Sequence, residues 1–234
     1  YSRPVLGFLW VFLSPFLMVI IFYIIFGLIL KVKTKEAPFV LYLMSGVFPW
    51  IFFQDTLLKS ITSLVDNKNL IKESNFPAYL IPVSIVMANT INFLPSLLIV
   101  VVTSLFVMKT LPIFIILLPF VLLIHLIILI GLSIIFSILY VKYRDIKYVV
   151  ETILLLLFYL TPVFYSFYLV KESFLPLLFR VYAYNPFFGM LNLYRITLLK
   201  GFYGIVQKDM DFLAITTMPI IFSIVVLFFS LYFY

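Results

Sequence analysis

The distribution of charged residues constrains this chain more than any other feature of its sequence. A helix rises about 1.5 Å per residue, so it needs about 20 apolar residues to cross the hydrocarbon core of a bilayer. Six stretches without Lys, Arg, Asp or Glu reach that length or fall a residue or two short of it: 4–30, 37–54, 74–108, 110–141, 152–170 and 212–234. They predict a multi-pass membrane protein.

Composition supports the same class. Hydrophobic residues make up 65% of the 234 residues, against about 45–50% in soluble domains. The net charge of +7 is spread over short segments between the apolar stretches, whereas a nucleic-acid-binding surface gathers its basic residues in one patch. We therefore expect membrane lipids, and no nucleic acid, around this chain.

We expect an all-α integral membrane protein with one transmembrane domain over residues 1–234. The predicted spans are about 5–30, 38–61, 82–108, 112–140, 149–167 and 212–234. A further apolar stretch, 181–194, is shorter than a span and contains Asn185, Pro186 and Gly189. It predicts a re-entrant or interfacial helix before the last span.

The fifth predicted span follows a polar turn and contains a proline. Four charged residues lie between Tyr140 and Tyr148, and the Thr161-Pro162 step interrupts the apolar run that follows. Proline removes one backbone donor, so we expect the helix to loosen there. In lipid the freed carbonyl must find a partner, which predicts that this end of the helix faces protein or a pore.

Orientation is not decided by the basic residues. With the N-terminus inside, the inner segments hold seven Lys and Arg and the outer segments hold nine, so the positive-inside rule favours neither orientation. When the long segment 168–211 is set aside, the count becomes seven against four and favours the N-terminus inside.

His125 is the one histidine of the chain and lies in the middle of the fourth span. A polar group within the membrane points to function, but a proton relay needs acidic neighbours and this span has none, so we expect a structural hydrogen bond. The sequence also has no cysteine, no cluster of metal ligands, no catalytic triad and no Gly-Lys-Ser/Thr phosphate loop. We expect a chain that is not an enzyme by itself and binds no cofactor.

Residues 66–82 connect the second and third spans and mix charges with the apolar Leu70, Ile71 and Phe76. The Phe76-Pro77 step breaks the backbone after them. This pattern predicts a short amphipathic helix between two turns, a shape suited to docking on a soluble partner. An ordinary solvated loop is the alternative.

Aromatic residues make up 20% of the chain. Tyr and Trp at span ends usually anchor a helix at the membrane interface. Aromatic residues inside the first and fifth spans fall at helical spacing, as a stacking surface for sugar rings requires, although a packed aromatic seam between helices gives the same spacing. These residues are Phe16, Tyr23, Phe26, Phe158, Tyr159, Phe164 and Tyr165.

Four blocks of the sequence carry a resemblance to a known family. They are YSRPVLGFLWVFLSPFL, SGVFPWIFFQDTLLKSITSLVDNKNLIKESNFPAYLIP, YVKYRDIKYVVETILLLLFYLTPVFYS and NPFFGMLNLYRITLLKG. In this order they resemble ABC-2 type export permeases, most closely the polysaccharide branch of O-antigen (Wzm-like), capsule and teichoic-acid exporters. The resemblance covers nearly the whole chain, and Arg144-Asp145, Thr161-Pro162 and Phe76-Pro77 are specific only in combination.

The resemblance implies a homodimer of six-span subunits in the inner (cytoplasmic) membrane, joined to two cytoplasmic ATPase subunits that bind ATP and Mg. It implies export of a lipid-linked polysaccharide through a channel at the dimer axis, lined by the seven aromatic residues of the first and fifth spans. The segments after the fifth span would gate the outer mouth. Coupling to the ATPase falls to Leu70, Ile71, Glu73, Phe76, Pro77, Arg144 and Asp145.

Other functions remain open at this point. Within the same family, an exporter of a drug or a small lipid would need a smaller and less aromatic path. An ion-coupled secondary transporter would show buried acids near mid-membrane, where this sequence has His125 alone. A membrane-embedded glycosyl or acyl transferase would show clustered His, Asp and Glu at one face, and the sequence has no such cluster.

Overall fold

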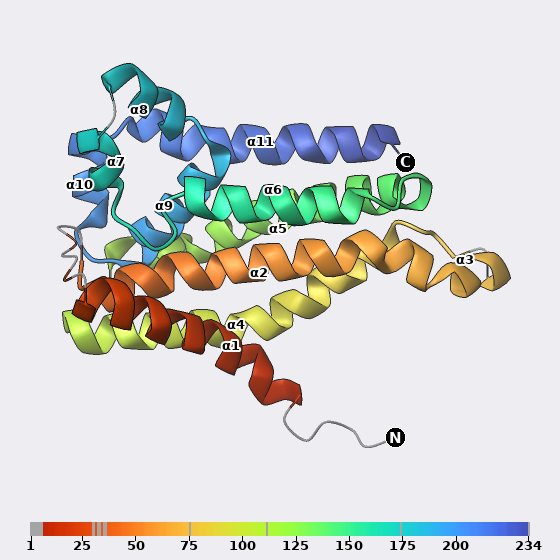
Figure 1. Ribbon diagram of the computed structural model, residues 1–234, viewed down its shortest axis with the longest axis horizontal. Helices are drawn as coiled ribbons and strands as arrows, with labels where there is room; N and C mark the ends of the chain where they lie inside the picture. The colour runs from red at the N-terminus through yellow and green to blue at the C-terminus, as the bar shows by residue number, and fades with distance from the viewer. Residues whose placement is uncertain are drawn as a thin grey trace.

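The chain folds into long helices that run along one axis of the molecule, with short helices at both ends (Figure 1). The computed structural model describes residues 7–29, 31, 34, 37–74, 76–110, 112–173 and 175–233, and every regular element within them is a helix. The long elements are α1 (Gly7–Phe22), α2 (Phe39–Asp66), α4 (Leu80–Met108), α5 (Leu118–Lys142), α6 (Ile146–Leu160) and α11 (Phe212–Phe233). The short α-helices are α3 (Lys68–Ser74), α7 (Phe167–Ser173), α8 (Pro176–Ala183), α9 (Pro186–Leu198) and α10 (Phe202–Asp209). Two further pieces are a π-helix, η1 (Tyr23–Ile29), and a 3₁₀-helix, η2 (Ile113–Leu117).

The all-helical membrane class is confirmed. Within the described residues, four helices are long and apolar enough to cross a membrane: Phe39–Asp66, Leu80–Met108, Ile113–Lys142 and Phe212–Tyr232. They match the predicted second, third, fourth and sixth spans to within a few residues. The first predicted span is represented by a shorter apolar helix, Phe16–Ile29, so the count of six spans stays a prediction.

The predicted fifth span, 149–167, is wrong in its bounds and in the effect of its proline. The helix ends at Leu160, and Thr161 has an extended backbone with φ −101° and ψ 142°. The ring of Pro162 disfavours helical angles at the residue before it, so the helix stops there where only a loosening was expected. The 15 residues of α6 extend about 22 Å, which is less than the thickness of a bilayer core.

The centre of the molecule is α2, which packs against α4, α5, α9, α1 and α6. All of its residues from Leu41 to Trp50 are buried, whereas a helix on the surface of a bundle buries only one face. The short α9 is also buried almost throughout and packs against α11, α2 and α5. The structure therefore has a short helix within its core.

The stretch 181–194, predicted as one re-entrant or interfacial helix, is divided between two helices. α8 ends at Ala183 and α9 begins at Pro186. The Asn185 side chain accepts a hydrogen bond from the Phe187 N–H at 3.0 Å, and proline at the first helical position has no N–H to leave unsatisfied. These two residues start α9 at a defined point.

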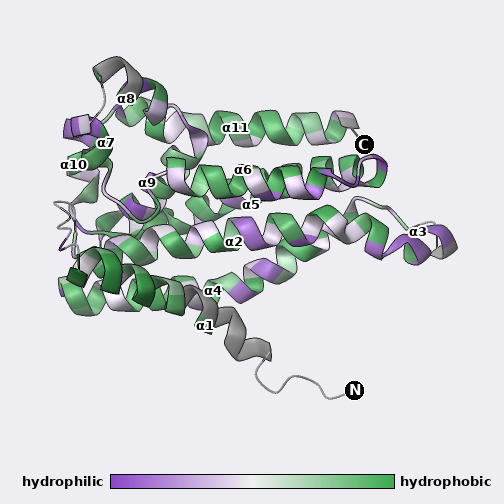
Figure 2. Ribbon diagram, in the orientation of Figure 1, coloured by the Kyte–Doolittle hydropathy of each residue, from purple (hydrophilic) through white to green (hydrophobic). Residues whose placement is uncertain are grey.

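The polar short helices lie at opposite ends of the molecule. α3 lies at one end, where the turn 142–146 between α5 and α6 also lies, while α7, α8 and α10 lie at the other (Figure 1). Figure 2 shows hydrophilic residues at α3 and α7 and mainly hydrophobic helices between them. We call these the α3 end and the α8 end. The helix predicted within residues 66–82 is confirmed as α3.

Candidate functional site

Rings from α1, η1, α6 and the segment after it form one packed cluster, which we call the aromatic seam (Phe22, Phe26, Phe158 and Phe164). Phe22 stacks on Phe164 with ring centroids 5.0 Å apart and on Phe158 at 6.0 Å. Phe26 lies 5.2 Å from Phe164. Phe158 and Phe164 are only 5% and 8% exposed. Together with Phe26, these predicted path residues pack helices against one another in this chain. Phe22 was not singled out, although it lies one helical turn before Phe26.

The other predicted path residues have different surroundings. Tyr159 is 59% exposed and Tyr23 is 37% exposed. Phe16 is half-buried and packs edge-on against Phe48 of α2 at 5.5 Å. Tyr165 is half-buried, and its hydroxyl donates to the Tyr159 carbonyl at 2.9 Å. Three of the seven residues therefore belong to the aromatic seam, while Tyr23 and Tyr159 are exposed. The seven do not form one continuous exposed face.

Arg195 of α9 is fully buried beside the break after α6. Its Nη2 donates to the carbonyl of Val163 at 3.1 Å and to that of Pro162. A segment outside helices in apolar surroundings leaves backbone carbonyls without partners. A guanidinium group offers several donors in a rigid plane, so one side chain can satisfy two of these carbonyls.

Tyr42 of α2 completes the surroundings of Arg195. The guanidinium carbon of Arg195 lies 3.8 Å from the centroid of the Tyr42 ring, a cation–π geometry that stabilises a buried cation. The Tyr42 hydroxyl donates to the carbonyl of Tyr165 at 3.1 Å. We call this set of contacts, among Arg195, Tyr42, Pro162, Val163 and Tyr165, the Arg195 clamp.

Gly46 of α2 lies directly against the clamp. A Cβ at this position would collide with the carbonyl oxygen of Val163 and come within 2.9 Å of Nη2 of Arg195. Glycine therefore permits the close approach of α2 to the backbone after α6.

The Arg195 clamp was not predicted, because Arg195 was counted among the loop cations. The sequence does indicate that Arg195 lies on a helix. Asn185-Pro186 is a typical helix start, and Arg195 follows it within the length of an ordinary helix. The partners of Arg195 could not be found this way, since Pro162 lies 33 residues away.

His125 makes the structural hydrogen bond that was predicted. Its Nδ1 lies 3.0 Å from the Tyr194 hydroxyl of α9. Phe52 and Phe53 pack on the imidazole with ring centroids at 5.1 and 5.8 Å. His125 thus ties α5 to α9 next to Arg195.

The α3 end carries the residues predicted to couple the chain to an ATPase. Leu70 is 47% exposed, Pro77 is exposed, and Ile71 and Phe76 are half-buried. The side chain of Glu73 lies outside the described part of the structure.

The turn between α5 and α6 holds the other two predicted coupling residues. Arg144 and Asp145 are both exposed. The Arg144 guanidinium lies 5.1 Å from the Tyr140 ring centroid, and Asp145 is the N-cap of α6, where a negative charge is favoured by the helix dipole. The structure places both groups of predicted coupling residues at the same end of the molecule (Figure 1).

At the α8 end, Asp209 joins α7 to α10. Lys171 Nζ lies 2.9 Å from Oδ1 of Asp209, and the Tyr168 hydroxyl donates to Oδ2 at 2.7 Å. These two hydrogen bonds, that from Lys171 first, lower the pKa of the Asp209 carboxyl from its ordinary value. A cavity of about 500 Å³ lies beside this pair and is lined in part by Arg180 and Tyr184.

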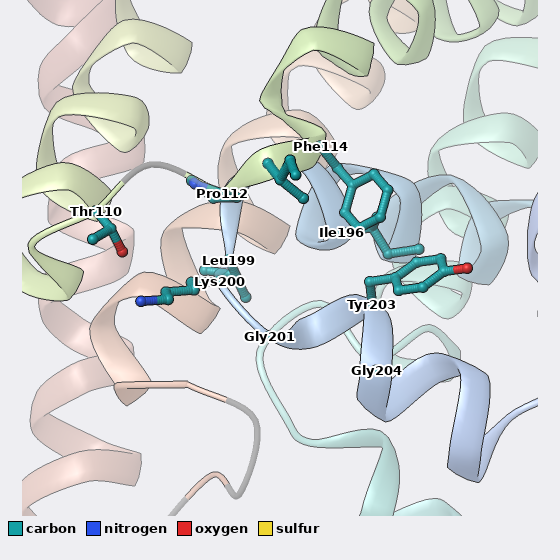
Figure 3. Close-up of a pocket in the computed structure, with 10 residues that line it drawn as sticks. Thr110, Pro112, Phe114, Ile196, Leu199, Lys200, Gly201, Tyr203 and Gly204 are labelled. Carbon is teal, nitrogen blue, oxygen red and sulfur yellow. The ribbon is translucent and has the colours of Figure 1, made fainter.

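A second cavity of about 380 Å³ lies at the same end, between the start of η2 and the turn from α9 to α10. The rings of Phe114 and Tyr203 face each other there with centroids 4.5 Å apart, and Lys200 extends away from them (Figure 3). Its lining is mostly apolar and includes none of the seven predicted path residues. This cavity is therefore separate from the aromatic seam.

The sequence was compared with known families and proteins. Residues 1–199 match the family described as ABC-2 type transporter. The chain belongs to the ABC-2 type transporter family. Two Klebsiella pneumoniae proteins named O-antigen export system permease protein RfbA are each 32% identical to it over 203 residues, which cover 86% of this chain and 76% of theirs. A Myxococcus xanthus protein of the same name is 29% identical over 195 residues, or 83% of this chain and 74% of its own length. The family resemblance is thus confirmed, and this ABC-2 transporter chain is a multi-pass membrane component of a transport system.

Proposed function

We propose that this chain is the transmembrane permease subunit of an ATP-driven exporter that carries a lipid-linked polysaccharide across the inner membrane. The polysaccharide would be of the O-antigen, capsule or teichoic-acid type. The observation that carries this proposal is the similarity to proteins named O-antigen export permeases over 86% of the chain. The chain itself performs no chemistry, and hydrolysis of ATP with Mg takes place on the partner.

In this proposal two copies of the chain join two cytoplasmic ABC ATPase subunits at the α3 end. An exposed Leu70 on a helix that carries Lys68 and Lys72 fits the groove-docking mode, in which an amphipathic helix buries its apolar residues on a partner. The Arg144-Asp145 turn lies at the same end. The α8 end would then face the outside.

The polysaccharide would pass the exposed edge of the aromatic seam at the dimer axis. A polymer that slides must be bound weakly along its path, and ring faces give contacts that do not depend on one direction along the chain. Tyr23 and Tyr159 are exposed enough to provide such faces. Phe158 and Phe164 support them from behind, since Tyr159 packs edge-on against both at 5.3 and 5.9 Å.

The proposal is tested in cells from which the gene has been deleted and then restored on a plasmid. We expect the deletion to abolish the surface polysaccharide and to leave its lipid-linked form on the cytoplasmic side, and the restored gene to reverse both effects. Normal surface polysaccharide in the deletion strain would contradict the proposal. Retention of a drug or small lipid would favour the alternative exporter.

A further inference from the structure

The geometry points to the Arg195 clamp as a latch that holds residues 161–166 closed at the α8 end and is released through movement of α2. This inference rests on the proposed function, since it assigns the release to the binding of the ATPase partner at α3. Arg195 is thus a positioning residue, which acts on the path through the segment that carries Phe164 and Tyr165.

Part of the backbone of residues 161–166 is held in place by side chains of other helices. No helix covers them, as they lie between the end of α6 at Leu160 and the start of α7 at Phe167. The backbone carbonyls of Pro162, Val163 and Tyr165 instead accept hydrogen bonds from side chains of other helices. Their conformation therefore depends on where α9 and α2 lie.

Helix α2 contributes half of the latch. Tyr42 covers the guanidinium group at 3.8 Å and also bonds to the Tyr165 carbonyl at 3.1 Å. Gly46, one turn further along, lies against the Val163 carbonyl. A small shift of α2 relative to α9 would disturb all of these contacts together, because close-packed helices leave few voids into which side chains can move.

Helix α2 is also directly joined to α3, the helix that is proposed to dock on the ATPase. It has 28 residues, so it is about 42 Å long, and it reaches from the α8 end to the α3 end (Figure 1). Asn67 is the single residue between α2 and α3, and its backbone N–H and side-chain amide both bond to the Ser63 carbonyl at 3.1 and 2.9 Å. This corner passes a force on α3 to α2.

The consequence is a defined change in accessibility. Ser166 is 4% exposed in the closed arrangement. When α2 moves and the clamp opens, the carbonyls of Pro162, Val163 and Tyr165 lose these partners. The segment then moves and Ser166 becomes exposed. The path between the aromatic seam and the outside would open at the same point.

The chain has no cysteine, so Ser166→Cys gives a single reporter for a membrane-impermeant maleimide. The full chain is purified with its ATPase and labelled in proteoliposomes without any substrate. We expect Arg195→Met to raise the labelling rate by about tenfold or more, because it removes charge-assisted hydrogen bonds, and Tyr42→Phe to raise it by a smaller factor. Ser133→Cys is the matched control and should stay slow, because Ser133 is fully buried in α5, a helix that contributes no residue to the clamp.

Unchanged labelling of Ser166→Cys in both variants would overturn the latch. If Arg195→Met also speeds up the labelling of Ser133→Cys, this variant has lost its packing as a whole. The Tyr42→Phe variant then decides, because faster labelling of Ser166→Cys supports the latch and an unchanged rate overturns it. Addition of ATP should raise the labelling rate in the parent. A rate that does not respond to ATP would overturn release through α2. Since no transport is measured, these results are independent of whether the substrate is a polysaccharide.

Discussion

The guanidinium carbon of Arg195 lies 3.8 Å from the ring centroid of Tyr42, and the two residues belong to helices that are far apart in the sequence. Between them they hold the carbonyls of residues that follow α6. A buried arginine needs partners for its donors and a surface for its cationic face. In this chain the carbonyls of Pro162 and Val163, after the end of α6, accept the hydrogen bonds. The Tyr42 ring of α2 covers the cationic face.

Gly46→Ala should destabilise the protein although alanine is the better helix former. The added methyl group would collide with the Val163 carbonyl, which is backbone and cannot turn away. We expect a loss of about 1–3 kcal/mol, typical of overpacking, and a lower melting temperature in detergent. Ser45→Ala, at the neighbouring buried position, is the control and should melt close to the parent. Equal melting temperatures for the two variants would contradict the close approach of α2.

Phe158→Ala and Tyr159→Ala should separate packing from transport. Phe158 contacts Phe22, Trp50 and Phe164 in the core, so its truncation should cost about 3–5 kcal/mol and reduce the yield of folded protein.

Tyr159 is mostly exposed, so Tyr159→Ala should keep a normal yield and melting temperature while export falls severalfold. Surface polysaccharide and thermal unfolding are measured for both variants. Full export by Tyr159→Ala would remove this residue from the path.

Leu70→Asp should abolish binding of the ATPase and leave the membrane part folded. An aspartate would place a charge where an apolar side chain is proposed to be buried against the partner. Burial of an unpaired charge at the interface strongly disfavours binding. Asn69→Asp adds the same charge to a neighbouring exposed position of α3 and should still bind. Co-purification of the ATPase is the measurement, and equal recovery with both variants would argue against docking through Leu70.

Asp209 should make the α7–α10 contact sensitive to acid. Because hydrogen bonds in the folded state lower its pKa below the ordinary 3.8, its contribution to stability is fully present above that value. The contribution is lost as the pH falls through the lower, folded-state pKa. The protection of the α7 amides, which is the slowing of their exchange relative to that of an unfolded chain at the same pH, should therefore fall below about pH 4 in the parent. Asp209→Asn should exchange faster already at pH 7 and lack this acid-dependent step, and a step of the same size in the variant would assign it to another group.

Four of the predicted spans agree with the structure because a long charge-free run has few alternatives in lipid. The end of α6 was mispredicted, because Pro162 can either kink or end a helix. The outcome depends on which groups donate hydrogen bonds to the backbone carbonyls around the proline. Those groups lie 33 and 123 residues away, in Arg195 and Tyr42. Aromatic spacing likewise predicts a face but not what covers it, so Phe158 and Tyr159, adjacent in sequence, have opposite surroundings.

Transport by the purified complex tests most directly the proposal that this chain moves a lipid-linked polysaccharide at the expense of ATP. Proteoliposomes that contain the chain with its ATPase are loaded with the lipid-linked polymer on the ATPase side, and the polymer that reaches the other side is measured with a glycan-cleaving enzyme. We predict translocation that requires ATP and Mg and is lost in Leu70→Asp. Absence of translocation by a complex that hydrolyses ATP, or equal translocation without ATP, would contradict the account.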